Sequence, residues 1–233
     1  MNHSNLTDKS NSRFKIKVVK NGPYIASGGI PLTAQMITLD DEGQCLGWRE
    51  TKRYPEQQNY SLCRCGHSKN KPFCDSSHKQ AAFDGTETAG HQSYSNQCQK
   101  YSGPTLDLTD ARPLCVHAGF CDRDGGTWDL VSHSEKPEAK KTAIEEGCAC
   151  PSGRLVIWDK QGNSLEPALE PSVGLVQLPT GEFTGTIWVR GGIPVVSANG
   201  ETYEIRNRVT LCGCGKSSNK PFCDGTHRKK QPG

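Results

Sequence analysis

The sequence predicts a mostly β protein with short helices, in which two small β-rich units form an intrachain pseudo-dimer and a small α+β unit is inserted between them. Hydrophobic residues make up only 33% of the 233 residues, which is too little for one large core and is typical of small units held by disulfides or bound metal. Short apolar stretches, separated by glycine and proline, occur in two parts of the chain and predict strands joined by turns. A Cys/His motif occurs twice, about 149 residues apart, which indicates an internal repeat.

The first β-rich unit is predicted over residues 14–94, after a disordered tail at residues 1–13. Its strands are expected within residues 14–60, where FKIKVV and GGIPLTAQMITL surround the turn sequence NGPY. The first Cys/His motif follows at residues 61–83. The unit therefore combines a small set of strands with one ligand-bearing loop.

A different unit is predicted over residues 95–158, and it contains the one segment with a clear helical signal. This segment, PEAKKTAIEE, runs from Pro137 to Glu146. Proline suits the first positions of a helix, and glycine commonly follows its last residue. We therefore expect the helix to stop at Gly147.

The second β-rich unit is predicted over residues 159–233, with strands within 172–210 and the second Cys/His motif at 211–227. The sequence Gly-Gly-Ile-Pro occurs at residues 28–31 of the first unit and again at residues 191–194 of the second. Because the repeat extends beyond the cysteines, we expect the two units to pair about an internal pseudo-twofold axis. Such a pair within one chain favours a monomer.

The composition argues against several classes of function. The chain opens with the polar sequence MNHSNLTDKSNSR, without the apolar stretch of a secretory signal, and no run of about 18 apolar residues occurs. We therefore expect a cytoplasmic protein without a membrane segment, whose 12 cysteines serve metal binding rather than disulfides. The formal net charge of +3 is too small to indicate nucleic-acid binding. No catalytic triad, nucleophile elbow or phosphate-binding loop is present, so we expect no enzymatic activity.

The two outer motifs both read C-x-C-x8-C-x3-H, with Asn-Lys-Pro-Phe before the third cysteine and aspartate after it. A [2Fe-2S] cluster needs four soft or borderline ligands from two converging segments. The C-x-C pair provides two thiolates, and the third cysteine and the histidine are expected on one face of a helical turn. Asp75 and Asp224 are expected to cap that turn. The predicted ligands are Cys63, Cys65, Cys74 and His78 in the first motif, and Cys212, Cys214, Cys223 and His227 in the second.

Both outer motifs resemble the CDGSH (mitoNEET-like) family of iron–sulfur proteins. The resemblance implies that each motif holds one [2Fe-2S] cluster through three cysteines and one histidine. The first motif departs from the family pattern at Ser76, where the second has Gly225; if this position needs a positive φ, serine costs about 1 kcal/mol. A structural zinc site remains the alternative, although zinc sites usually have C-x2–4-C spacing.

The middle unit contains a further set of candidate ligands in CVHAGFC and CACPSGRL. With YSG near the start of this segment, these blocks resemble a family of divergent single-cluster [4Fe-4S] ferredoxins. The resemblance implies a ferredoxin-like unit whose ligands are Cys115, His117, Cys121 and Cys150.

The details of this third site remain open at the level of sequence. Cys148 is an extra thiol that could replace His117 as the fourth ligand, in which case His117 only donates or accepts hydrogen bonds. Four ligands serve a [4Fe-4S] cluster, a [2Fe-2S] cluster or a structural zinc ion. Cys45 and Cys98 are further candidate ligands, although we expect them to be free thiols.

The sequence therefore predicts a multi-cluster iron–sulfur protein for one-electron transfer or redox sensing. Replacing one thiolate by a neutral imidazole raises the reduction potential of a cluster and makes it sensitive to pH. The alternatives are a protein that stores or transfers [2Fe-2S] clusters and a structural zinc module. The partner would be a redox protein or an apo-protein acceptor, and basic residues near the motifs indicate an acidic one, unless they are only a solvated surface. These basic residues are Lys69, Lys71, Lys79, Lys216, Lys220, Arg228, Lys229 and Lys230.

Overall fold

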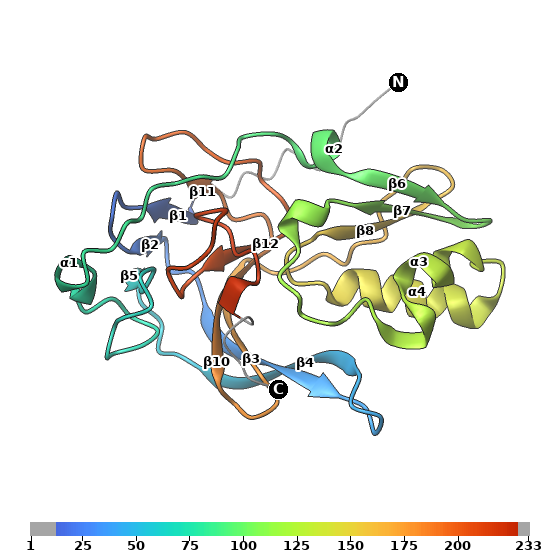
Figure 1. Cartoon of the computed structure of the whole chain (residues 1–233), viewed down its shortest axis with the longest axis horizontal. Coiled ribbons are helices and arrows are strands. Elements are labelled where there is room, and N and C mark those ends of the chain that lie inside the picture. The colour runs from blue at the N-terminus through green and yellow to red at the C-terminus, as the bar shows by residue number, and fades with distance from the viewer. Residues whose placement is uncertain (1–12, 228–233) are drawn as a thin grey trace.

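The computed structural model describes residues 13–227, and strands predominate over short helices in this part. The predicted tail, apart from its last residue, and the basic residues 228–233 lie outside the described part of the chain. Figure 1 shows the strands of the outer units on one side of the molecule and the longest helices, which belong to the middle unit, on the other. The predicted fold class is confirmed.

The elements follow the predicted order of β-rich, mixed and β-rich segments. The first outer unit contains β1 (Lys15–Val18), β2 (Tyr24–Ser27), β3 (Leu32–Leu39), β4 (Cys45–Arg53), β5 (Asn59–Leu62) and α1 (Ser77–Gln80). The middle of the chain contains α2 (Tyr94–Gln97), β6 (Gln99–Ser102), β7 (Leu106–Asp110), the 3-10 turns Arg112–Leu114 and Arg123–Gly125, α3 (Thr127–Ser132), α4 (Pro137–Ala149) and β8 (Leu155–Asp159). The second outer unit contains β9 (Ser172–Gln177), β10 (Phe183–Arg190), β11 (Val195–Val196) and β12 (Arg208–Cys212).

The two outer units exchange one strand each. One sheet has the order β11-β1-β2-β5, so that a strand of the second unit lies parallel to β1 of the first. The other sheet has the order β12-β10-β9-β3-β4, so that β3 of the first unit lies parallel to β9 of the second. Apart from the added edge strand β4, the two sheets have the same order and the same strand directions. This relation is the internal pseudo-twofold symmetry that the repeat predicted.

The repeated Gly-Gly-Ile-Pro sequence is the point at which each strand crosses to the other unit. All four glycines of the two copies have a positive φ, a conformation that costs glycine nothing. Directly after them, Pro194 accepts a hydrogen bond from the backbone N–H of Ile16, and Pro31 accepts one from that of Val173, at 2.9 and 2.8 Å. The repeat outside the cysteines therefore encodes the exchange of strands.

The exchange gives the outer units one common hydrophobic core. Side chains from β1, β2, β3 and β5 pack in a single cluster with side chains from β9, β10 and β12. The common core explains how a chain with few apolar residues forms two ligand-bearing units, since neither unit has to bury its strands alone.

The middle unit has a separate core between a three-stranded antiparallel sheet and two helices. The sheet has the order β6-β7-β8, and α3 and α4 pack on it through Leu130, Val131 and Ala143. Its apolar partners are Leu106, Leu108, Leu155 and Ile157. The predicted α+β character of this unit is thus confirmed.

The predicted end of the helix at Gly147 is wrong, because α4 continues to Ala149. A Cβ atom at Gly147 would lie 2.6 Å from Cγ1 of Ile157, which is closer than two such atoms can approach. Glycine is therefore needed here for the close approach of α4 to β8, and not as a stop signal. One consequence is that Cys150 directly follows the last helical residue.

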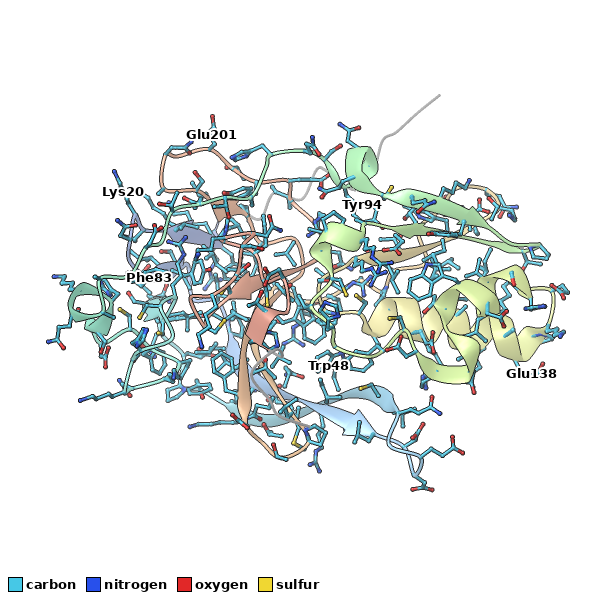
Figure 2. The ribbon with its side chains drawn as sticks, viewed as in Figure 1. Lys20, Trp48, Phe83, Tyr94, Glu138 and Glu201 are labelled. Atoms are coloured by element: carbon cyan, nitrogen blue, oxygen red, sulfur yellow. The ribbon has the colours of Figure 1, made fainter. Side chains whose placement is uncertain are left out.

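Aromatic side chains join the three units. The ring of Trp48 lies 4.8 Å from that of Phe120 in the middle unit and 4.7 Å from that of Trp188 in the second outer unit. Its Nε1 donates to the carbonyl of Ala149 at 2.9 Å, and Figure 2 shows Trp48 between the outer strands and the helices.

Within residues 13–227, no helix has the length and apolar character that crossing a membrane requires.

Candidate metal centres

The two outer ligand loops have the same backbone anchors. The backbone N–H of Cys63 donates to Pro72, and that of Cys212 donates to Pro221, at 2.8 Å in both loops. The hydroxyls of Ser68 and Ser217 each donate to the carbonyl of the phenylalanine before the third cysteine, at 2.6 Å. These bonds hold each loop against the strand that carries its C-x-C pair. The third cysteine and the histidine are thereby brought close to the C-x-C pair, although eight residues separate the two parts of the motif.

The predicted ligands of each outer motif lie as two pairs. The Sγ atoms of the C-x-C cysteines lie 3.7 Å apart in the first loop and 3.6 Å apart in the second. In both loops, Sγ of the third cysteine lies 3.5 Å from Nδ1 of the histidine. Two thiolates bound at about 2.3 Å to one tetrahedral metal ion lie about 3.7 Å apart, so each pair has the spacing of two ligands on one ion. The donor types and the spacing within each pair therefore fit a two-metal centre, in which each pair would hold one ion.

The expected helical turn between the third cysteine and the histidine is wrong. Cys74 lies outside α1, and Ser76 between them has a φ of 70°, while Gly225 in the second loop has a φ of 75°. A left-handed residue interrupts the helix and still brings the sulfur to the imidazole. Asp75 accepts from the backbone N–H of Ser77, and Asp224 from that of Thr226, at 3.0 Å each, but Asp75 does not cap α1 as expected, because the N-cap residue is Ser76, which makes no side-chain cap. These bonds lower the pKa of Asp75, and in Asp224 they outweigh the opposing effect of burial, so that its pKa is lowered too.

The two outer loops touch each other across the pseudo-twofold axis. A Cβ atom at Gly66 would lie 2.6 Å from the carbonyl oxygen of Cys214, and one at Gly215 would lie 2.6 Å from that of Cys65. The fully buried Tyr24 of the first unit adds a hydrogen bond from its hydroxyl to Cys212 and Pro221, at 2.9 Å each. Each outer centre is therefore built partly by the other unit.

The local environment of the second loop stabilises one thiolate and disfavours another. The Sγ contact with Cys214, together with backbone N–H groups, lowers the pKa of Cys212 to about 6. Burial raises the pKa of Cys223 to about 12. A bound metal ion stabilises thiolate ligands and would therefore offset the cost of ionising the buried Cys223.

The middle centre is a cavity of 430 Å³ that the predicted ligands line together. Cys115, His117, Cys121 and Cys150 all face this cavity, along with Trp128. Burial raises the pKa of Cys121 to about 12, and the backbone N–H of His117 donates to Sγ of Cys115 at 3.4 Å. The cavity therefore combines the four predicted ligands in one place.

A residue that the sequence did not indicate also belongs to the middle centre. Nη1 of the buried Arg154 donates to Sγ of Cys115 at 3.0 Å. The same guanidinium forms two hydrogen bonds to the buried carboxylate of Asp110, at 2.6 and 2.8 Å. The Asp110 carboxylate therefore fixes the guanidinium of Arg154 in contact with a candidate ligand sulfur. Arg154 falls at the variable position of the C-P-S-G-x-L pattern, so no local signal pointed to it.

The remaining cysteines lie outside this set. The thiol of Cys148, the alternative fourth ligand, does not line the cavity and donates to the carbonyl of Leu165 at 3.5 Å. Cys45 donates to Ala118 at 3.3 Å, and Cys98 to Ser95 at 3.6 Å. All 12 cysteines lie within residues 13–227, and none of them forms a disulfide.

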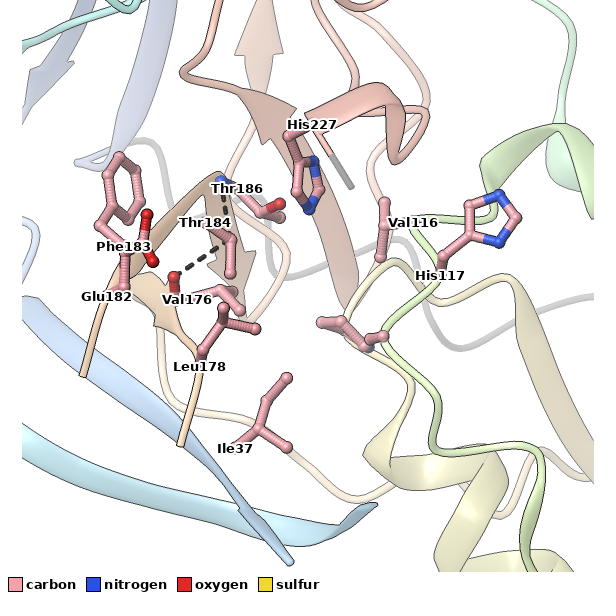
Figure 3. Close-up of a pocket in the computed structure, with 12 residues that line it drawn as sticks. Ile37, Val116, His117, Val176, Leu178, Glu182, Phe183, Thr184, Thr186 and His227 are labelled. Atoms are coloured by element: carbon pink, nitrogen blue, oxygen red, sulfur yellow. Dashed lines mark hydrogen bonds between the residues drawn. The ribbon is translucent and has the colours of Figure 1, made fainter. Parts of the chain in front are cut away.

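A smaller pocket of 180 Å³ lies between the second outer centre and the middle centre. Figure 3 shows His227 from the second outer loop on the same pocket as Val116 and His117 from the middle unit. Asp224 of the outer loop also lines the cavity of the middle centre. The second outer centre and the middle centre are therefore neighbours.

The predicted basic residues near the two loops differ in exposure. Lys69, Lys71, Lys79 and Lys216 are exposed, and Lys220 is half-buried. The others, Arg228, Lys229 and Lys230, lie outside the described part of the chain.

Two outer loops with close Cys–Cys and Cys–His pairs, and a middle cavity lined by three cysteines and one histidine, are typical of an iron–sulfur-binding protein. Residues 21–79 and 184–228 match the family described as iron-binding zinc finger CDGSH type. Residues 101–160, between them, match the family described as divergent 4Fe-4S mono-cluster. Both resemblances predicted from the motifs are confirmed, and the matches indicate that the chain binds iron–sulfur clusters. A comparison with curated proteins gave no match, and neither did one with solved structures.

Proposed function

We propose that the protein is a cytoplasmic, monomeric, multi-cluster iron–sulfur protein that serves one-electron transfer or redox sensing and catalyses no reaction of its own. A bound iron–sulfur cluster supplies reversible one-electron chemistry. The outer motifs would each hold a [2Fe-2S] cluster, and the cavity of the middle unit would hold a third cluster, of the [4Fe-4S] type that its family match names.

The observation that carries this proposal is the direct contact between the three ligand sets. The two outer loops touch through Gly66 and Cys214, and the second outer loop touches the middle centre through Gly225 and His117. The middle centre, the second outer centre and the first outer centre thus lie in a row of contacting loops. Such an arrangement is expected of a protein that holds several redox groups close together, and a set of separate structural zinc sites would not require it.

The histidines give the outer centres a position at which a proton can bind. Nδ1 of His78 faces Sγ of Cys74, and Nδ1 of His227 faces Sγ of Cys223. If Nδ1 binds metal, Nε2 remains to hold or release a proton. Because protonation changes the charge at the centre, we propose that the reduction potentials of the outer centres depend on pH.

The first test is the metal content of anaerobically purified protein. We expect a red-brown protein that contains about eight iron atoms and equivalent sulfide per chain, for two [2Fe-2S] clusters and one [4Fe-4S] cluster. About six iron atoms would instead indicate a [2Fe-2S] cluster in the middle unit. A colourless protein with stoichiometric zinc after iron-supplemented expression would contradict the proposal and favour the structural zinc module.

The alternative function is the storage or transfer of [2Fe-2S] clusters to apo-proteins. The exposure of the first ligand loop favours it, because Asp75, Ser76 and the basic Lys79 are all accessible there. An acidic acceptor or redox partner would suit the lysines of this loop.

Replacing His78 and His227 together by cysteine should separate the two functions. We expect a lower reduction potential and slower cluster loss, because a thiolate adds negative charge and binds iron more firmly than imidazole. Potentiometry between about pH 6 and 9 should show a pH dependence in the native protein that the double variant lacks. Unchanged transfer to an apo-ferredoxin by the double variant would contradict the carrier function, and pH-independent native potentials would contradict proton coupling.

A further inference from the structure

The two outer loops differ in how far the rest of the protein covers the three residues that begin at the third cysteine, although they share the sequence Asn-Lys-Pro-Phe-Cys-Asp. In the first loop Cys74 is half-buried and Ser76 is exposed. In the second loop Cys223 is only 2% exposed and Gly225 is buried. Because the two loops have the same backbone anchors, the difference must come from what packs against them.

The middle unit packs against the second loop at Gly225. A Cβ atom at Gly225 would lie 2.6 Å from Cδ2 of His117 and 3.0 Å from the backbone of Val116. No side chain larger than hydrogen fits there without movement of the middle unit. The glycine at this position is thus explained by the contact, whereas the equivalent Ser76 has a similar φ and points into solvent.

The first loop lies away from the middle unit. Figure 1 shows α1, which carries His78, at the end of the molecule opposite to α3 and α4. Within residues 13–227, Asp75, Ser76 and Lys79 of this loop are exposed, and none of these three lines a cavity shared with the middle unit. A chelator or an acceptor protein can therefore approach the first centre from the side of Cys74 and His78, which are half-buried.

We propose that the first outer centre is the exchange site of the protein, while the Val116–His117 segment of the middle unit restricts access to the second outer centre. This inference rests on the proposed presence of one cluster at each outer motif. It assigns different roles to two motifs of nearly identical sequence: the first gives iron and sulfide to the outside, and the second retains them next to the middle centre.

The proposal is tested by the release of iron to EDTA from the complete, cluster-loaded chain at one pH. EDTA takes up the ferric ions, sulfide leaves as hydrogen sulfide, and the cysteine thiolates take up protons from solvent. Cys74→Ser is used to disable the first centre and Cys223→Ser the second, and the middle centre is common to both variants. In the Cys223→Ser chain only the first outer centre remains, and in the Cys74→Ser chain only the second. We expect iron to leave the Cys223→Ser chain about tenfold faster than the Cys74→Ser chain, because release from the second centre requires the middle unit to move first.

The chain itself offers a matched pair of substitutions. Gly225→Ser introduces the residue that the first loop already contains, and it should displace the middle unit and accelerate release from the second centre towards the rate of the first. Ser76→Gly is the reciprocal control and should leave both rates unchanged, because Ser76 is exposed and glycine keeps the backbone N–H that donates to Sγ of Cys74. Circular dichroism verifies that both variants are folded.

The wild-type protein provides a measurement that does not depend on any variant. Its outer-centre iron should leave in two phases of equal amplitude. A single phase, faster release from the second centre, or a Gly225→Ser chain that is folded and releases iron at the wild-type rate would each overturn the assignment of the exchange site. Failure of the proposed function is distinguishable, because the purified chain would then contain no iron–sulfur cluster at the outset.

Discussion

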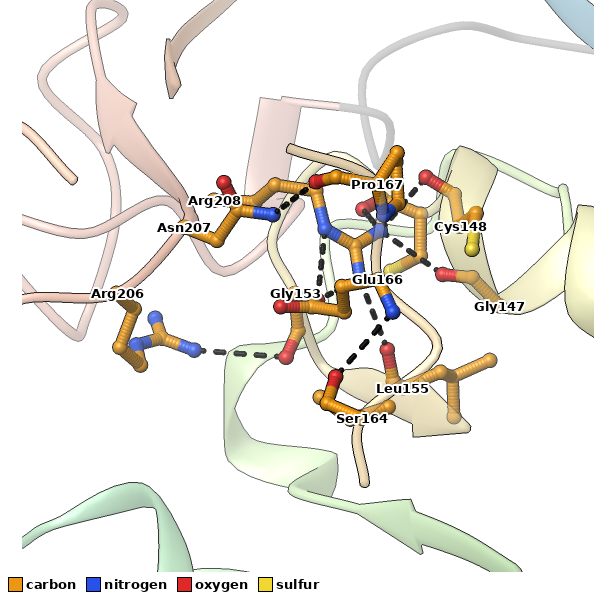
Figure 4. Close-up of polar contacts among 12 residues, drawn as sticks. Gly147, Cys148, Gly153, Leu155, Ser164, Glu166, Pro167, Arg206, Asn207 and Arg208 are labelled. Atoms are coloured by element: carbon orange, nitrogen blue, oxygen red, sulfur yellow. Dashed lines mark hydrogen bonds and ion pairs between the residues drawn. The ribbon is translucent and has the colours of Figure 1, made fainter. Parts of the chain in front are cut away.

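Replacement of Arg208 by methionine is expected to lower the free energy of unfolding by about 3–5 kcal/mol, the usual cost of removing one partner of a buried ion pair. Arg208 on β12 is 1% exposed, and its guanidinium pairs with the carboxylate of Glu166. Figure 4 shows this side chain at the centre of a group of polar contacts. Methionine has a similar length but no hydrogen-bond donor, so Glu166 and several carbonyl groups would lose their partner.

Those carbonyl groups belong to the segment that carries a candidate ligand. Nη1 of Arg208 donates to Gly147 and Cys148 at 2.8 Å each, and to Cys150 at 2.7 Å. These groups lie at the carboxyl end of α4, where a positive charge is favourable. A residue of the second outer unit therefore orients the Cys150 segment of the middle centre, and the variant should also lose iron from that centre.

Urea titration of the anaerobic, cluster-loaded protein measures this change, and Arg206→Met is its matched control. Arg206, two residues away, makes only longer hydrogen bonds of 3.3 and 3.5 Å to the carbonyls of Ser152 and Gly153. Within residues 13–227 it forms no ion pair with a carboxylate, so its loss should cost about 1 kcal/mol. Equal effects of the two substitutions would contradict the special role of Arg208.

The second large effect is expected at the middle centre, where Cys150→Ala should remove the third cluster and Cys148→Ala should not. The thiol of Cys150 lines the cavity together with those of Cys115 and Cys121. The thiol of Cys148, two residues earlier, is directed to the carbonyl of Leu165 instead. Replacing a cluster ligand removes a covalent attachment, whereas replacing Cys148 removes only a weak hydrogen bond.

Iron and sulfide counts per chain measure this difference. If the third cluster is a [4Fe-4S] cluster, Cys150→Ala should lose about four of about eight iron atoms, and Cys148→Ala should retain all of them. The visible spectrum of the outer centres serves as the internal control, since neither cysteine belongs to them. Loss of iron in Cys148→Ala, with Cys150→Ala unaffected, would show that the assignment of these two cysteines is reversed.

The strands and the outer motifs could be predicted because their signals are local. Alternation of apolar residues and glycine–proline turns predicted the β-rich segments, and the repeated Gly-Gly-Ile-Pro predicted a pseudo-twofold pair. The exchange of β3 and β11 could not be predicted, since the sequence does not say whether a strand pairs within its own unit or with the other. The end of α4 was misjudged because Gly147 serves packing against Ile157, a contact between residues in different elements.

By itself, the sequence determined the chemistry of the outer sites, because three thiols and one imidazole at close spacing form a ligand set wherever the loop lies. Only the tertiary structure decided that His117, and not Cys148, lines the middle cavity. It also brought Arg154 into hydrogen-bonding distance of Cys115, and it left Cys74 more exposed than Cys223. Each of these depends on contacts between segments far apart in the chain. Two loops of almost the same sequence acquire different surroundings because a third unit packs against only one of them.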